Sequence, residues 1–218
     1  MARVEDGKRR YVPLNRLEQE GVAKVGVFLL VFSLQNHKVW VIEEKKAKKS
    51  TGKVAGRIGV PAETRKQGET ICDNTRGVLV EEMGIDRNHP ARANFYYVDG
   101  LSYRGRYQLR VEGKKVHADV VTLVYSGDPS IIFWPQTGEF GADEVAPVGW
   151  MEPRDLQQDK KLRFGLEYIL RTGIKNGWGE SLLEHWRLRE IGEGNRVRRV
   201  FAADVVEDDR KMKVDVGE

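Results

Sequence analysis

The feature that most constrains the fold is the longest apolar run of the sequence, from Val25 to Leu34. The run has the composition of a β-strand. It is too short to cross a bilayer, which needs about 20 residues. Gln35-Asn36-His37 follows as a turn, and Val39 to Ile42 is a second strand-like segment. The two segments and the turn between them predict a β-hairpin.

A helix is predicted from Thr70 to Met83. Its apolar positions form a rough stripe at the i, i+4, i+7, i+8 spacing of a helix face. These positions are Ile71, Thr75, Val78, Leu79 and Met83. Gly84 follows directly, as glycine commonly does after the last turn of a helix.

The remaining segments complete a mixed α/β pattern. Strands are predicted at Phe95 to Val98, Val116 to Tyr125 and Val145 to Trp150. Helices are predicted at Leu162 to Leu170 and Ser181 to Ile191. Loops or turns are predicted at 45–53, 56–68 and 103–115. The tail, at 197–206 and 212–216, is either a late hairpin or disordered.

Composition limits the class of protein. The chain has 218 residues, of which 40% are hydrophobic and 32% charged, as in soluble globular proteins. The N-terminus lacks the pattern of a secretory signal, so we expect a cytoplasmic protein with no membrane partner. The single cysteine, Cys72, excludes an intramolecular disulfide and a cysteine-based zinc cluster.

Basic residues are concentrated in one segment, although the formal net charge is only +4. The cluster contains Lys45, Lys46, Lys48, Lys49, Lys53 and Arg57. One interpretation is a solvated loop. The other is a patch that attracts phosphates, because focused positive charge concentrates anions. Nucleic acid would satisfy the same patch.

Three short segments around the predicted helix resemble the Nudix hydrolase family. They are Gly56-Arg57-Ile58-Gly59-Val60-Pro61, Gly68-Glu69-Thr70 and Glu81-Glu82-Met83-Gly84-Ile85. The family box reads Gly, five residues, Glu, seven residues, Arg-Glu-aliphatic, one residue, Glu-Glu, one residue, Gly-aliphatic. In the ungapped register, Glu69 and Leu79 also match the box.

Three positions depart from the box. Its first Gly is Glu63, its Arg is Gly77 and the following Glu is Val78. In the family, that Arg braces the loop and that Glu lies on the metal face of the helix. Arg76 could replace the lost Arg only through a one-residue insertion, which would rotate it by about 100° around the helix.

The resemblance implies a Nudix-type α/β/α sandwich with a mixed sheet, followed by a C-terminal helical extension. We expect an N-terminal arm at 1–20, a Nudix-like domain at 21–170 and the extension at 171–218. It also suggests a homodimer, because family members often form dimers.

The resemblance further implies a magnesium or manganese site. Magnesium prefers oxygen ligands and completes its shell with waters and substrate phosphates. The expected metal ligands are Glu81, Glu82 and Glu63. The expected catalytic residues are Glu81, Glu82 and Glu144, with Glu139 and Asp143 as other acids before the closing strand. The expected substrate-binding residues are Lys53, Arg57 and Glu69.

Two functions follow. The first is Mg-dependent hydrolysis of a nucleoside diphosphate linked to another moiety, in which the metal neutralises the diphosphate and activates water. The alternative is a catalytically impaired Nudix-fold module that binds a nucleotide or acts as a regulator. Gly77 and Val78 favour the module, whereas the retained pair of Glu81 and Glu82 favours the enzyme.

Overall fold

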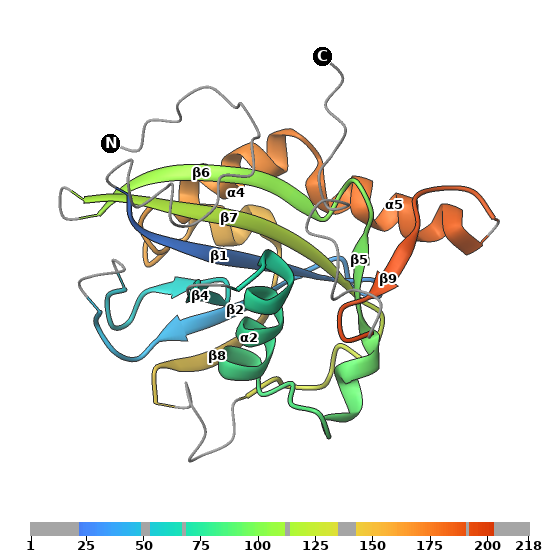
Figure 1. Ribbon diagram of the computed structural model, residues 1–218, viewed down its shortest axis with the longest axis horizontal. Coiled ribbons are helices and arrows are strands. Elements are labelled where there is room, and N and C mark those ends of the chain that lie inside the picture. The colour runs from blue at the N-terminus through green and yellow to red at the C-terminus, as the bar shows by residue number, and fades with distance from the viewer. Residues whose placement is uncertain are drawn as a thin grey trace.

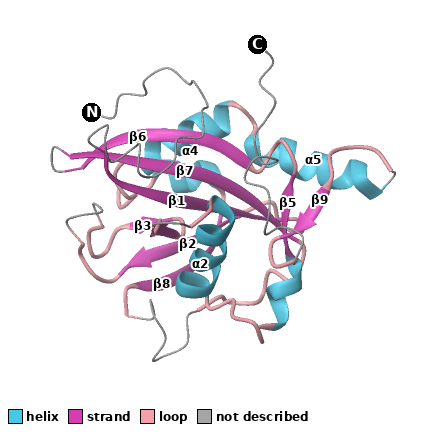
Figure 2. Cartoon of the chain, viewed as in Figure 1, coloured by secondary structure: helices cyan, strands magenta, loops and turns pink. Residues whose placement is uncertain are grey.

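The computed structural model describes residues 22–48, 53–66, 69–111, 114–134, 143–190 and 192–202. The strands are β1 (Val22–Ser33), β2 (Val39–Glu44), β3 (Ile58–Gly59), β4 (Ala62–Thr64), β5 (Phe95–Val98), β6 (Tyr103–Val111), β7 (Lys114–Tyr125), β8 (Val145–Met151) and β9 (Val197–Arg199). The helices are α2 (Ile71–Met83), α3 (Pro153–Gln158), α4 (Leu166–Lys175) and α5 (Trp178–Glu190), with a 3₁₀ helix η2 (Pro90–Asn94). Figures 1 and 2 show their arrangement.

The strands form one mixed sheet, whose main path runs β3-β2-β1-β7-β5-β9. β1 and β7 pair in parallel along nearly their whole length, whereas β2 pairs antiparallel with β1 after the turn. β4 pairs with β1, β6 with β7 and β8 with β2. The predicted hairpin of β1 and β2 is confirmed, and so is the mixed α/β class.

Side chains of β1 alternate between two apolar layers, because successive residues of a strand point to opposite faces. One layer joins β1 to α2 and includes Val27, Leu29, Val31, Val78, Leu79 and Met83. The other joins β1 to α4 and α5 and includes Phe28, Leu30, Phe32, Leu166, Ile169 and Leu182. The central strand is therefore buried on both sides, with α2 in front of the sheet in Figure 1 and α4 and α5 behind it.

Helix α2 begins and ends as its sequence predicts. Thr70 is its N-cap and forms a reciprocal capping box with Asp73. Gly84 ends the helix in the left-handed conformation, at φ 69°. These caps fix where α2 begins, after the loop that follows β4, and where it ends.

The C-terminal part of the described chain packs on the domain. The expected domain boundary at residue 170 falls inside α4. β9 pairs antiparallel with β5, and Trp178 and Leu182 of α5 lie in the apolar layer behind the sheet. Among the described residues, no helix combines the length and the apolar character that crossing a membrane requires.

The segment predicted as a polar turn region, from Tyr103 to Lys115, is instead largely strand β6, which forms a hairpin with β7. Its polar side chains find partners across the sheet: Arg106 pairs with the buried Asp119. Its alternate positions Tyr107 and Leu109 are buried. The polar residues of this segment therefore belong to an edge strand whose charged side chains have partners, and not to a turn.

Other predicted boundaries also shift. The segment 56–68, predicted as loop, contains the short strands β3 and β4. The helix predicted from Leu162 begins only at Leu166, because Gly165 adopts the left-handed conformation at φ 84°. Of the predicted tail, residues 197–199 form β9, and 212–216 lie outside the described residues.

Two glycines should respond to alanine in opposite ways. A Cβ added to Gly77 would meet no atom within 4 Å, so Gly77→Ala should raise the free energy of unfolding by about 0.5–1 kcal/mol. A Cβ on Gly26 would lie 2.8 Å from the carbonyl oxygen of Glu63, so Gly26→Ala should lower it by about 1–3 kcal/mol. Urea unfolding of both variants measures these changes. A destabilised Gly77→Ala would show that α2 needs its glycine.

Candidate functional site

The centre of the candidate site is a buried ion pair. Glu82, near the end of α2, is 3% exposed, and Lys53, from the loop after β2, is 5% exposed. Lys53 Nζ lies 2.7 Å from Glu82 Oε1. The backbone N–H of Ala62 donates to Glu82 Oε2 at 2.6 Å. Both carboxylate oxygens of Glu82 thus accept a hydrogen bond from the protein itself.

Burial and charge act against each other in this pair. Burial raises the pKa of the Glu82 carboxyl, and Lys53 and the Ala62 N–H partly offset that rise. Burial alone would lower the pKa of Lys53, but the attraction of Glu82 outweighs it, so the pKa of Lys53 is raised. Because two donors face Glu82 and its oxygens need no proton, we describe the pair as ionised.

A second buried pair lies beside the first. Arg163 Nη1 is 3.0 Å from Glu44 Oε1, and the Val54 N–H donates to Glu44 Oε2 at 2.8 Å. Burial raises the pKa of Glu44, against the opposing attraction of Arg163. Glu144, before β8, completes the group, with Oε2 3.8 Å from Lys53 Nζ. The protein thus gathers alternating charges, and Lys53, predicted to bind substrate, is paired with Glu82, predicted to bind a metal.

Glu81 points away from this buried group. It is 28% exposed and lies 3.4 Å from Nζ of Lys66, which is 67% exposed. The pKa of Lys66 is raised first by Glu81 and further by Glu69 and Glu63. These three acids therefore surround an exposed lysine. Such a solvent-exposed pair contributes little to stability.

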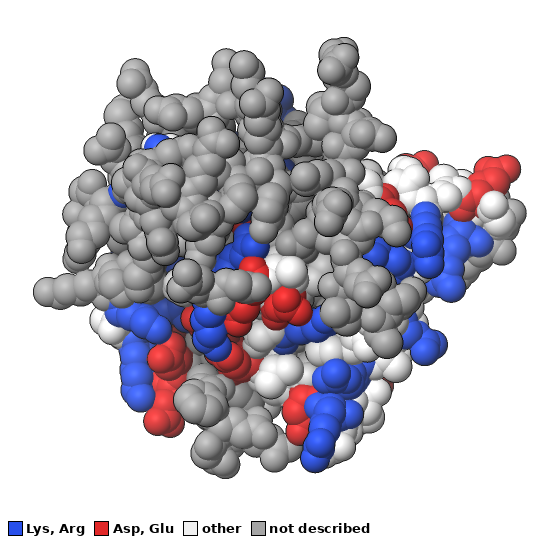
Figure 3. Space-filling model, in the orientation of Figure 1, with Lys and Arg blue, Asp and Glu red and all other residues white. Residues whose placement is uncertain are grey.

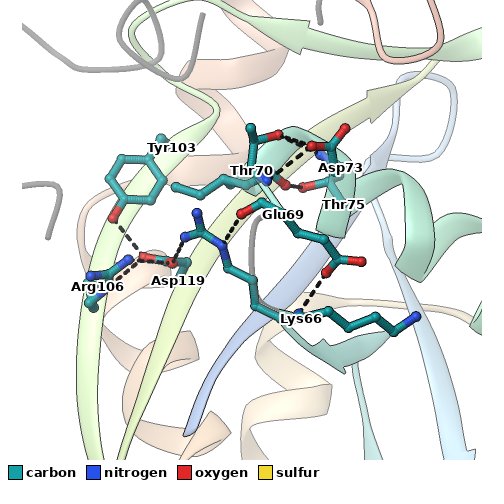
Figure 4. Close-up of polar contacts among 10 residues, drawn as sticks. Lys66, Glu69, Thr70, Asp73, Thr75, Tyr103, Arg106 and Asp119 are labelled. Carbon is teal, nitrogen blue, oxygen red and sulfur yellow. Dashed lines mark hydrogen bonds and ion pairs between the residues drawn. The ribbon is translucent and has the colours of Figure 1, made fainter. Parts of the chain in front are cut away.

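The loop before α2 is braced by Arg65, which directly follows β4. Its Nε donates to the carbonyl oxygen of Glu69 at 2.7 Å, and its Nη1 lies 3.9 Å from Asp119. Asp119 is fully buried and also binds Arg106 at 2.8 Å and the Tyr103 hydroxyl at 2.8 Å. Figure 4 shows this network next to the capping box of α2. Arg65 thus holds the loop before α2, a role that the resemblance assigned to the residue at position 77.

The sequence carried signals for two of these residues that the motif did not capture. Asp119 is the only acid in the otherwise apolar segment from Val116 to Tyr125, which marks a buried charge with a partner. Glu82 follows Val78 by four positions, so it continues the apolar stripe of α2. Arg163 and Glu44 had no such local signal, because their pairing depends on how distant segments meet.

Val78, which replaces a box glutamate, is fully buried in the layer between α2 and the sheet. Glu63 forms a local hydrogen bond, in which its Oε1 accepts from the Thr64 N–H at 2.8 Å. Glu69 Oε2 similarly accepts from the Lys66 N–H at 2.8 Å. Each of these acids therefore has a role in holding the loop.

The basic segment does not form a single patch in the described residues. Arg57 Nη1 donates to the Lys160 carbonyl oxygen at 2.8 Å. Lys46 lies 3.4 Å from Asp143, and Lys45 lies over the Trp134 ring. Figure 3 shows the described basic and acidic side chains interspersed on this face. Lys49 and Glu139 lie outside the described residues.

A cleft opens beside the buried pair. The charged residues of its lining are Lys48, Lys53, Glu63 and Arg163, and its apolar residues include Val25, Phe28 and Phe164. It encloses about 50 Å³, several times the space that one water needs. Phe164 is 58% exposed, so it stands at the open side of the cleft.

The residues at Glu82 do not fit a divalent cation as they lie. Both of its oxygens are occupied by protein donors, one of them an ammonium. Val78 adds no oxygen. Among the described residues, no group of three or more His, Cys, Asp or Glu side chains is placed to hold a metal ion.

No protein-family model and no curated protein matches the chain. Similar solved structures include the MutT protein from Methanosarcina mazei Go1, with 13% identity and a TM-score of 0.49 over 71% of this chain and 94% of that one. A NUDIX hydrolase from Nitrosomonas europaea has 16% identity and a TM-score of 0.47 over 71% and 89%. The NUDIX domain of Shewanella oneidensis NrtR, complexed with ADP ribose, has 12% identity and a TM-score of 0.48 over 78% and 93%. Similarity at this level assigns no activity to this chain.

The brace predicts the effect of Arg65→Lys. Lysine keeps the charge but lacks the planar fork that reaches two acceptors, so the Glu69 carbonyl should lose its donor. We expect a loss of about 1–3 kcal/mol in stability. Hydrogen exchange should become faster in the first turn of α2. Lys66→Arg, on the exposed side of the same loop, is the matched control and should change neither quantity. Unaltered exchange in Arg65→Lys would argue against the brace.

The buried pair predicts a stability loss at alkaline pH. Because the folded-state pKa of Lys53 is raised above its ordinary value of 10.5, its contribution is fully present below that pH. The contribution is lost as pH rises through the folded-state pKa. Unfolding of wild type against a double variant, Lys53→Met with Glu82→Gln, isolates this alkaline slope. Identical slopes in the two proteins would contradict an ionised pair.

Proposed function

We propose that this chain is a Nudix-type nucleotide-binding module that takes a nucleoside diphosphate or a derivative of one and needs no divalent cation at Glu82. The observation that carries the proposal is the 2.7 Å contact between Lys53 Nζ and Glu82 Oε1 beside the cleft. A cation is therefore already present where an anionic ligand would need one.

The lining of the cleft suits such a ligand. Its three basic residues, Lys48, Lys53 and Arg163, outnumber its one acid, Glu63, and would attract phosphates. An ammonium has three N–H donors, and Glu82 takes one from Lys53, so the others can serve a phosphate oxygen. The enclosed space suits the phosphate end alone. The nucleoside would then lie along the open side, against Phe164.

The side chain of Phe164 is suited to hold a base. It is one of the few large apolar side chains that the described residues expose, and it borders the cleft. Bases stack on aromatic rings with little dependence on their identity. The proposal therefore names the class of ligand, a nucleotide with a diphosphate, and not a particular base.

A second candidate is Mg-dependent hydrolysis of a phosphoanhydride, in which Glu81, Glu63, Glu69 and Glu144 would supply the acids. The observation that favours it is the exposed contact of Lys66 with Glu81. An exposed lysine can leave its partner at little cost, which would free these oxygens for a cation. In this candidate Glu82 would keep its lysine and position the helix.

The binding proposal is tested by titrating ADP and ADP-ribose into wild type, with Mg²⁺ and with EDTA. We expect equal affinities in the two buffers. Phe164→Ala should weaken binding by about tenfold or more, because stacking of a base on an aromatic ring is worth roughly 1–3 kcal/mol. Tyr168→Ala, four residues further along the chain in α4 and outside the cleft, is the matched control. Binding that requires Mg²⁺, or that survives Phe164→Ala unchanged, would reject the proposal.

The enzyme candidate has its own test. Phosphate release from a panel of nucleoside diphosphate derivatives is measured with Mg²⁺ for wild type, Glu81→Gln and Glu82→Gln. The binding module predicts no turnover above background. Turnover that falls at least tenfold in Glu81→Gln, equivalent to about 1.4 kcal/mol, would establish the second candidate.

A further inference from the structure

We infer that Lys53 is the resident cation of this site: its ammonium stands where a divalent cation would have to bind Glu82, and its removal would create a metal site. The inference deepens the proposed function. If that function holds, the positive charge that faces the ligand belongs to the chain itself, and a chelator cannot remove it.

Several carboxylates lie around Lys53. Its Nζ lies 2.7 Å from Glu82 and 3.8 Å from Glu144. Glu44 and Glu63 also attract it electrostatically. These acids come from the end of α2, the end of β2, β4 and the residue before β8, and carboxylate oxygens are the ligands that a hard cation takes in proteins. Here they converge on an ammonium that is 5% exposed.

Lys53 and the Ala62 N–H oppose a second cation at Glu82. Four carboxylates, Glu44, Glu63, Glu82 and Glu144, face the two cations Lys53 and Arg163, so the opposition comes from the occupied oxygens of Glu82 and not from the net charge. A divalent cation at Glu82 would stand beside an ammonium and would have to displace the Ala62 N–H or Lys53 from its oxygens. Without Lys53, the same carboxylates would lack their main counter-charge.

Val78 fits this arrangement. A unit charge on Lys53 is balanced by Glu82 alone, whereas a divalent cation needs more carboxylates. A glutamate at position 78 would add a buried negative charge with no partner, which is unfavourable. The valine is fully buried and packs in the layer between α2 and the sheet. The loss of the box glutamate and the presence of Lys53 are therefore two parts of one change.

The test is a titration of Mn²⁺, without nucleotide, into wild type, Lys53→Ser and Lys53→Ser with Glu82→Gln. Free Mn²⁺ is followed by electron paramagnetic resonance, and the melting temperature is recorded in parallel. Wild type should bind no Mn²⁺ at this site. Lys53→Ser should gain affinity by about 30-fold or more, from removal of the repulsion between single and double charges about 4 Å apart even in water. Mn²⁺ should also raise its melting temperature.

The controls separate this site from the exposed acids. Adding Glu82→Gln to Lys53→Ser should abolish the gain in Mn²⁺ affinity, and Lys66→Ser alone should produce no gain. Wild-type Mn²⁺ binding that Glu82→Gln weakens would overturn the inference, and so would a folded Lys53→Ser with no gain. If Lys53→Ser does not fold, wild type against Glu82→Gln still decides, together with Lys53→Arg, which keeps a cation and should bind no Mn²⁺. Because no nucleotide is present, failure of the proposed binding function would leave these results unchanged.

Discussion

The parallel pairing of β1 with β7 determines where everything else can lie. It places an apolar strand in the middle of the sheet, with β2 and β4 on its other side. Because β1 buries side chains on both faces, helices must cover both faces of the sheet. The close approach of β4 to β1 at Gly26 then brings Ala62 and Arg65 next to α2. Ala62 binds Glu82, and Arg65 holds the loop before α2. The position of the site therefore follows from how the central strands pair.

A charge buried by this packing must be neutralised within the fold. Glu82 lies on the same stripe of α2 as the core residues Val78, Leu79 and Met83. Removing either member of a buried pair leaves an uncompensated charge, which typically costs about 3–5 kcal/mol. Lys53 and the Ala62 N–H meet this requirement from the loop and from β4. The loop after β2 is therefore tied to the helix by electrostatics, because its own sequence offers few apolar anchors.

The sequence predicted the elements better than the site. Apolar, β-rich segments located β1, β2, β5, β7 and β8, and a helical stripe located α2, because burial leaves a signal in the sequence. β6 was missed because the arginines that pair with acids across the sheet look like loop residues. The resemblance placed Glu81 and Glu82 in one metal site as adjacent acids. Adjacent helical residues point about 100° apart, however, so one became buried and the other stayed on the flank.

What the sequence could not supply was the partner of each charge. Lys53 precedes Glu82 by 29 positions, and Arg65 precedes Asp119 by more than 50. No local pattern reports such contacts, since they depend on the register of β4 and on the path of the loop. The residues of a motif keep their roles only while the residues that they contact are kept as well. Once the brace comes from Arg65 and the counter-charge from Lys53, position 77 needs no arginine and Val78 packs between α2 and the sheet. The departures from the box then belong to a different kind of site. In it, an ammonium and a carboxylate take the place of a metal and its ligands.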